Sequence, residues 1–200
     1  MNPSKAEMRE RLRRVRREHA AALSGGTHAL LFMRPPQAIA TAVPRHAVIG
    51  LYAEGRHEAP AGRYATWFAE RGHPIALPWF AGPDATMAFR AWDPLAPEPL
   101  QPGPFGIRQP PLSAAECRPD LVFVPLLGFT PQGARLGQGA GHYDRWLAAH
   151  PDVVAIGLAW DCQRMESLPI EPHDRPLAAV ITPTRLYGSV GGSLGLVKAR

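Results

Sequence analysis

Four uninterrupted apolar runs limit the fold of this chain more than any other feature. They are residues 47–53 (AVIGLYA), 121–127 (LVFVPLL), 153–160 (VVAIGLAW) and 178–182 (AAVIT). Runs without polar alternation are typical of strands that are buried on both faces of a parallel sheet. Two weaker strand candidates lie at 75–78 and 86–92, the second of which alternates as a strand with one exposed face does.

Helical patterns separate these runs. They cover residues 61–71, ended by Gly72, and residues 142–150. Alternation of strand and helix predicts an α/β fold with a mostly parallel sheet and right-handed crossovers. In such sheets the binding site lies beyond the carboxyl ends of the strands, which directs attention to the segments after residues 53, 127, 160 and 182.

Length and composition narrow the class of protein. With 200 residues, 46% hydrophobic and 20% charged, we expect a single domain over residues 1–200, since domains hold roughly 100–200 residues. No stretch of about 18 apolar residues suggests a transmembrane helix, and no apolar segment follows the basic N-terminus as in a secretory signal. Two cysteines do not make a disulfide framework. We therefore expect a cytoplasmic protein without membrane contacts, acting as a monomer.

The positive charge of the chain is concentrated at its N-terminus. Residues 1–20 hold seven Lys and Arg against three Glu, whereas the other 180 carry 15 positive and 14 negative side chains. Ser4 and Glu7 fit a capping box, which predicts a basic helix at about 4–24. Its arginines have three open interpretations: a solvated face, a surface for nucleic acid or membrane, or one or two cations that reach a phosphate in the site. The absence of interleaved aromatic residues argues against RNA.

The string from Arg135 to Asp144, RLGQGAGHYD, is the strongest local signal. Gly137, Gly139 and Gly141 alternate between a buried strand and a helix, so that successive backbone N–H groups are able to surround one anion at the helix N-terminus. Arg135 adds a charged donor, and Asp144 adds a carboxylate suited to magnesium beside phosphates. The spacing matches neither a P-loop nor a Rossmann motif. A flexible loop that caps the helix is the alternative.

Three further residues have two interpretations each. Glu58, after the first strand, is either a ligand for amino groups of a substrate ring or a residue of a solvated loop. Asp174, in a proline-rich segment, is either a second carboxylate beside the metal or a surface residue. Phe105, in Gly103–Ile107, either stacks on a flat ligand or fills the core beneath a turn.

Taken in order, these motifs resemble those of the 5-formyltetrahydrofolate cyclo-ligase family, also called methenyltetrahydrofolate synthetases. The densest match is Asp120–Leu147, which holds VPLLGF and RLGQGAGHYDRWL. The other matching pieces are Lys5-x-x-x-Arg9, Tyr52 to Glu58, Ala76–Pro78, Met87–Trp92, Gly103–Ile107 with Pro110, Ala155–Trp160 with Gln163, Leu168–Asp174 and Val180–Thr182. The resemblance covers nearly the whole chain.

The resemblance implies a three-layer α/β/α fold like that of sugar-phosphate isomerases and CoA-transferases. It also implies closure of 5-formyltetrahydrofolate to 5,10-methenyltetrahydrofolate, a small-molecule reaction that uses ATP and Mg²⁺ and releases ADP and phosphate after an iminium phosphate forms. Such chemistry rests mostly on positioning and charge neutralisation. The implied ATP-binding residues are Lys5, Arg9, Arg135, Leu136, Gly137, Gln138, Gly139, Ala140, Gly141, His142 and Tyr143.

The same resemblance assigns the remaining roles. Arg135 and Tyr143 would act in catalysis, Asp144 and Asp174 near magnesium, and Ala53, Glu58, Phe105 and Tyr143 around the folate. The five other arginines of the helix are expected to be solvated.

The chain departs from the family pattern in three places. His142 replaces the first of two adjacent tyrosines, residues 25–46, with Pro35-Pro36, match poorly, and Trp160 stands where the family usually has Phe. Two alternatives follow: a family member with lost or altered activity, and a nucleic-acid-binding protein that uses the arginine helix.

Overall fold

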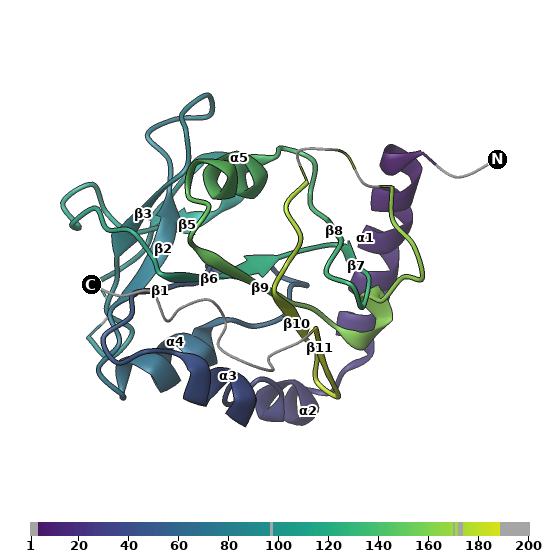
Figure 1. Ribbon diagram of the computed structural model, residues 1–200, viewed down its shortest axis with the longest axis horizontal. Coiled ribbons are helices and arrows are strands. Elements are labelled where there is room, and N and C mark those ends of the chain that lie inside the picture. Colours follow the sequence, from purple (N-terminus) through teal and green to yellow (C-terminus); the bar gives the residue numbers. More distant parts are fainter. Residues whose placement is uncertain (1–3, 97, 170, 172–173, 189–200) are drawn as a thin grey trace.

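A seven-stranded sheet forms the centre of the molecule (Figure 1). The structure is a computed structural model, and it describes residues 4–96, 98–169, 171 and 174–188. The strand order is β11-β10-β9-β6-β1-β2-β3. The strands are β1 (Ile49–Gly50), β2 (Ile75–Trp79), β3 (Ala88–Ala91), β6 (Leu121–Pro125), β9 (Val154–Leu158), β10 (Ala179–Ile181) and β11 (Leu186–Tyr187).

Five neighbouring strands, from β10 to β2, run parallel, and the two edge strands β3 and β11 are antiparallel to their neighbours. The parallel centre corresponds to the four apolar runs and residues 75–78, so the predicted sheet is confirmed. The run at 47–53 contributes a shorter strand than expected, because only Ile49 and Gly50 pair on both sides.

Helices cover both faces of the sheet, which makes three layers. Figure 1 shows α2 (Gly25–Leu30), α3 (Gln37–Ala42) and α4 (Gly62–Ala69) below the sheet and α5 (His142–Ala149) above it. Alternate residues of β6 point to opposite faces. Leu121 and Phe123 join the core between the sheet and helices α3 and α4, whereas Val122 and Val124 join the core between the sheet and α5. The predicted break at Pro35-Pro36 separates α2 from α3.

The basic N-terminal helix is α1 (Lys5–Ala22), and Ser4 and Glu7 form the predicted capping box. It packs beside the hairpin of β7 (Gly128–Phe129) and β8 (Arg135–Leu136) through Met8, Leu12, Leu127 and Leu136. A Cβ atom on Gly128 would lie 2.7 Å from Leu12 Cδ1, so this glycine allows the close approach. The contact places the cationic face of α1 against the glycine string that follows β8.

Short elements complete the fold. They are the hairpin of β4 (Gln101–Pro102) and β5 (Arg108–Gln109) and the 3₁₀ turns η1 (Pro104–Gly106) and η2 (Asp161–Gln163). Within the described residues, no helix is long and apolar enough to cross a membrane.

The strand order changes direction at β1. From β1 the chain moves to β2 on one side and later to β6 on the other. The crevice at the carboxyl ends of β1 and β6 is therefore the place where a parallel sheet binds ligands.

Candidate active site

A cavity of about 930 Å³ lies at these strand ends. It is lined by Leu51–Ala53 after β1, by Leu77 and Pro78 of β2, and by Val124 and Pro125 of β6. Every residue assigned a site role from the sequence lines it: Lys5, Arg9, Ala53, Glu58, Phe105, Arg135, Leu136, Gly137, Gln138, Gly139, Ala140, Gly141, His142, Tyr143, Asp144 and Asp174. Eight segments that are distant in the sequence thus meet at one opening.

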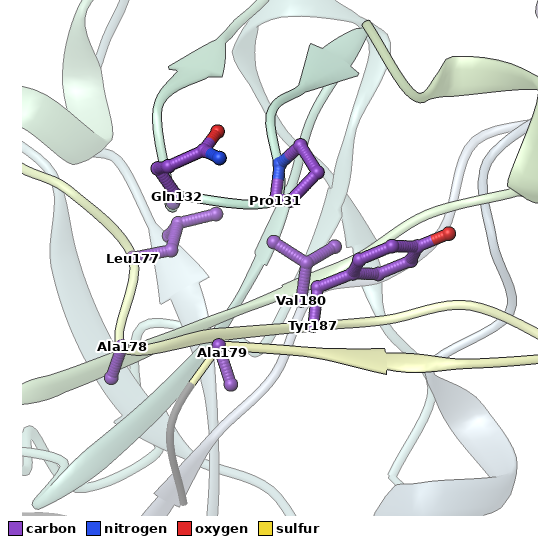
Figure 2. Close-up of a pocket in the computed structure, with 9 residues that line it drawn as sticks. Pro131, Gln132, Leu177, Ala178, Ala179, Val180 and Tyr187 are labelled. Carbon is purple, nitrogen blue, oxygen red and sulfur yellow. The ribbon is translucent and has the colours of Figure 1, made fainter. Parts of the chain in front are cut away.

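A second pocket, of about 250 Å³, lies at the β10–β11 edge of the sheet, between the turn after β7 and strand β10 (Figure 2). Its lining is Pro131, Gln132, Gly133, Leu177, Ala178, Ala179, Val180, Tyr187 and Gly188. This lining carries no carboxylate and no cation. The larger cavity is the candidate active site because, among the described residues, it combines a much greater volume with several charged groups.

The glycine string forms one wall of the large cavity. Gly139 has φ +116° and Gly141 has φ +67°, and Gly141 is the N-cap of α5. Arg9 Nε donates to the Gly137 carbonyl at 3.2 Å, and Arg13 Nη2 donates to the Gln138 carbonyl at 2.8 Å. In a planar trans peptide the C=O and N–H point in opposite directions. The N–H groups of Gln138 and Gly139 therefore point away from these arginine side chains and are left available to a ligand.

Arg135 is the most buried cation of this wall. Its side chain is 4% exposed, pairs with Asp144 and donates to the Arg175 carbonyl at 2.6 Å. Burial lowers the pKa of the Arg135 guanidinium and Asp144 opposes that shift, but a guanidinium stays charged in proteins. Asp144 lies in the first turn of α5, where the helix dipole stabilises a carboxylate.

Lys5 also lines the cavity, where it pairs with two carboxylates. Its Nζ lies 3.0 Å from Glu171 Oε1 and 3.2 Å from Asp174 Oδ2. Burial lowers the pKa of Lys5, but hydrogen bonds to Glu171 and Asp174 outweigh it and raise the pKa overall. Among the described residues, no three Asp, Glu, His or Cys side chains come close enough together to hold a metal ion by themselves. Asp144 and Asp174 instead each face a cation.

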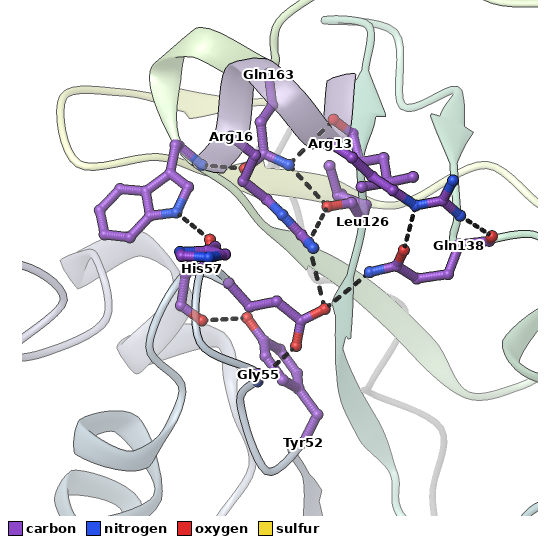
Figure 3. Close-up of polar contacts among 12 residues, drawn as sticks. Arg13, Arg16, Tyr52, Gly55, His57, Leu126, Gln138 and Gln163 are labelled. Atoms are coloured by element: carbon purple, nitrogen blue, oxygen red, sulfur yellow. Dashed lines mark hydrogen bonds and ion pairs between the residues drawn. The ribbon is translucent and has the colours of Figure 1, made fainter. Parts of the chain in front are cut away.

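Glu58 is held from several directions by Arg16, Gln138 and Gly55, which Figure 3 labels. Its Oε1 accepts from Arg16 Nη1 at 3.3 Å and from Gln138 Nε2 at 3.2 Å, and its Oε2 accepts from the Gly55 N–H at 2.9 Å. Trp160 Nε1 donates to the His57 carbonyl at 3.0 Å, which fixes the same loop. The solvated-loop interpretation of Glu58 is therefore wrong, since its side chain is only 14% exposed.

Aromatic rings line the floor. Phe105 is 58% exposed and adopts φ +62°, so it is not the core residue that one interpretation proposed. Its ring centroid lies 4.9 Å from that of His142 and 5.6 Å from that of Phe80. The Tyr143 hydroxyl is buried, has no hydrogen-bond partner among the described residues, and has a raised pKa because of burial. Flat rings and an unused hydroxyl suit a flat, polar-edged ligand.

The sequence model of the 5-formyltetrahydrofolate cyclo-ligase family matches residues 1–183. The chain belongs to this family. Among individual relatives, the 5-formyltetrahydrofolate cyclo-ligase of Escherichia coli K12 is 40% identical over 87 residues, which are 40% of this chain and 48% of the relative. That of Mycolicibacterium smegmatis is 40% identical over 101 residues, or 47% of this chain and 51% of the relative. The matched stretches thus span about half the length of these relatives.

Solved structures of the family share the fold. A 5,10-methenyltetrahydrofolate synthetase of Aquifex aeolicus is 23% identical with a TM-score of 0.69, over 98% of this chain and 94% of that one. A synthetase of Mycoplasma pneumoniae is 21% identical with a TM-score of 0.63, over 90% and 98%. At these identities the likeness concerns the fold.

The expectation that all five other arginines of α1 are solvated is wrong. Arg16 is not solvated: only 9% of the residue is exposed, and it reaches Glu58 and the Leu126 carbonyl. Arg13 is exposed but contacts the glycine string. A signal for Arg16 existed in the sequence, because it follows Leu12 by four residues and so shares the buried face of α1. The contributions of Arg13 and Trp160 depend on partners more than 100 residues away and leave no local signal.

Proposed function

We propose that this chain catalyses the ATP- and Mg²⁺-dependent closure of 5-formyltetrahydrofolate to 5,10-methenyltetrahydrofolate, with release of ADP and phosphate. One observation carries the proposal. In a chain of this family, a single cavity brings together a cationic, glycine-rich string, one oriented carboxylate and the exposed Phe105 ring. The string suits a triphosphate, and the carboxylate with the ring suits a flat ligand with N–H groups at its edge.

The residues present fit ATP. Lys5, Arg9 and Arg135 bring three cations to the cavity, and the string from Gly137 to Gly141 lines it at the start of α5, where helix N-termini offer N–H groups to anions. A Cβ atom on Gly139 would lie 3.5 Å from Arg9 Nε, in the space between loop and cation. In this proposal Arg135 neutralises charge on the transferred phosphoryl group, because it is held rigidly by Asp144 and the Arg175 carbonyl.

The residues also fit magnesium in the way that phosphate-bound magnesium is usually held. This ion prefers oxygen ligands and takes one or two carboxylates with phosphate oxygens and waters, rather than a full protein cage. Asp144 and Asp174 both line the cavity and supply such carboxylates. Both face cations now, Arg135 and Lys5, so the charges of this region are already arranged for an anionic ligand with its counterion.

The formyl group defines what the protein must do. A formamide oxygen is a poor leaving group, and ATP supplies the phosphoryl group that makes it a good one. N10 of the same folate then attacks the formyl carbon of the iminium phosphate, and phosphate leaves. Both reacting atoms belong to one molecule, so the chain contributes chiefly by fixing the folate conformation and excluding water. We assign the positioning of the folate to Glu58, Phe105, Tyr143 and the backbone at Ala53.

We also propose that the protein is a single domain that works in the cytoplasm as a monomer.

The test is an absorbance assay for methenyltetrahydrofolate formed from 5-formyltetrahydrofolate. Product should form with ATP and Mg²⁺ together and not when either is omitted. Binding of both substrates without turnover would favour the alternative of a family member with altered activity, which His142 motivates. Absence of folate binding would refute the proposal.

A further inference from the structure

One arginine of α1 lines the cavity but has no role in the proposed reaction. It is Arg16, which reaches the cavity beside Glu58. Its Nη1 contacts Glu58 Oε1 at 3.3 Å and the Leu126 carbonyl, just beyond β6, at 3.5 Å. The pair is well shielded, since the side chains of Arg16 and Glu58 are 11% and 14% exposed. Shielded ion pairs are held more firmly than surface pairs, and removal of one partner leaves an uncompensated charge.

The hydrogen bonds of Glu58 show what this pair achieves. A carboxylate accepts about four hydrogen bonds, two at each oxygen. Oε1 is satisfied by Arg16 and Gln138, and Oε2 accepts from Gly55. Among the described residues, one acceptor position therefore stays open on Oε2, and it belongs to a residue that lines the cavity.

Gln138, a residue of the glycine string, also holds the Glu58 carboxylate in place. Arg13 Nε approaches Gln138 Oε1 at 3.4 Å, and Gln138 Nε2 donates to Glu58 at 3.2 Å. Because a guanidinium only donates and a carboxylate only accepts, the orientation of the amide is determined. Figure 3 shows Arg13 and Arg16 converging from α1 on Gln138 and on the carboxylate beside it.

We propose that Arg16 is a positioning residue for folate: it holds Glu58 Oε1 so that Oε2 faces the N–H groups of the substrate ring. Arg16 acts through Glu58 and does not itself touch the reacting atoms. This inference rests on the proposed function, because it takes folate as the ligand of Glu58. Without Arg16 the carboxylate keeps Gln138 and Gly55 as partners, so the fold survives while the orientation of Glu58 loosens.

The experiment is a double-mutant cycle read by calorimetric binding of 5-formyltetrahydrofolate and, separately, of ATP with Mg²⁺. The variants are Arg16→Met, which removes the charge at similar volume, Glu58→Gln, and the two combined. Arg17→Met is the matched control, since Arg17 is an exposed arginine of the same helix. Arg16→Met should raise the folate Kd about tenfold, the size of one weakened charged hydrogen bond, and change the ATP Kd less than about twofold. In the Glu58→Gln background the same change should cost little further affinity.

Several outcomes would overturn the inference. Equal losses from Arg16→Met in both backgrounds would show that Arg16 does not act through Glu58. Parallel losses of folate and ATP affinity, or a loss as large in Arg17→Met, would indicate a general structural or charge effect. If Arg16→Met fails to fold, Arg16→Lys replaces it in the same measurements. A folate Kd of Arg16→Lys equal to that of the unaltered protein at every pH and salt concentration would show that the guanidinium of Arg16 is not needed to hold Glu58.

The same measurements separate this inference from the proposed function. If the unaltered protein binds folate but does not turn it over, the proposed reaction fails while the cycle still decides the role of Arg16. If turnover is normal and the cycle is additive, the inference alone fails.

Discussion

Replacement of Gly139 by Val tests the phosphate-binding loop most directly. Gly139 has φ +116°, which a β-branched residue strongly resists, so the change imposes about 1–3 kcal/mol of backbone strain. The nearest atom to a new Cβ would be Arg9 Nε at 3.5 Å, an ordinary contact, and the residue is exposed. We therefore expect the strain to be relieved by a shift of the loop and not by unfolding of the core.

Such a shift moves the N–H groups of Gln138 and Gly139 away from phosphate oxygens. One charged hydrogen bond is worth about 1.5–3 kcal/mol, so losing even one raises the ATP Kd roughly 10- to 150-fold. The assay is calorimetric titration with ATP and Mg²⁺ alongside thermal unfolding. Gly72→Val is the matched control: Gly72 also has a positive φ, +82°, with no atom within 4 Å of a new Cβ, and it lies outside the cavity. An unchanged ATP affinity in folded Gly139→Val would refute the phosphate-binding role of the loop.

The other predictions concern charge. Lys5→Ala should weaken ATP binding with the fold intact, measured by the same titration, because the half-buried Lys5 side chain, 21% exposed, lies outside the hydrophobic core. Glu58→Gln should weaken folate binding more than ATP binding, and equal losses would contradict a folate role. Asp144→Asn should shift the magnesium dependence of turnover to higher concentrations and also lower the stability by about 1–3 kcal/mol, since it leaves the buried Arg135 with a weaker partner. The free energy of unfolding should fall as the pH drops below about 6.5, because burial lowers the pKa of His73 and folding therefore favours its neutral form. In urea titrations at pH 5 to 8, His73→Gln should make the free energy of unfolding less dependent on pH.

The centre of the sheet was predictable because burial on two faces demands an uninterrupted apolar run. Leu121–Pro125 and Val154–Leu158 satisfy that demand over five residues each. The edge strand β11 and the hairpin of β7 and β8 have only two residues per strand, too few for any period to show. Strand order likewise depends on which crossover passes on which side of β1, and no local pattern records it.

The candidate site likewise has one part that the sequence predicts and another that it does not. The string from Arg135 to Asp144 was visible because all its chemistry lies within ten residues of sequence. The orientation of Glu58 was not, since its partners Arg16 and Gln138 are 42 and 80 residues away. A carboxylate alone after a strand is compatible with a ligand or with solvent, and only the partners decide between them.

The block of arginines at the N-terminus shows why a count of charge is a poor guide to function. Helical spacing divides the block between two faces. Lys5, Arg9, Arg13 and Arg16 follow one another at four, four and three residues, and all four contact polar groups in or beside the cavity. Arg11, Arg14 and Arg17 follow at intervals of three on another face and are exposed. A variant with Gln at these three positions should therefore keep most of its activity, whereas including Arg13 and Arg16 should not. If both sets were equally harmful in the absorbance assay, the net charge of the helix and not the geometry of one face would be what the reaction needs.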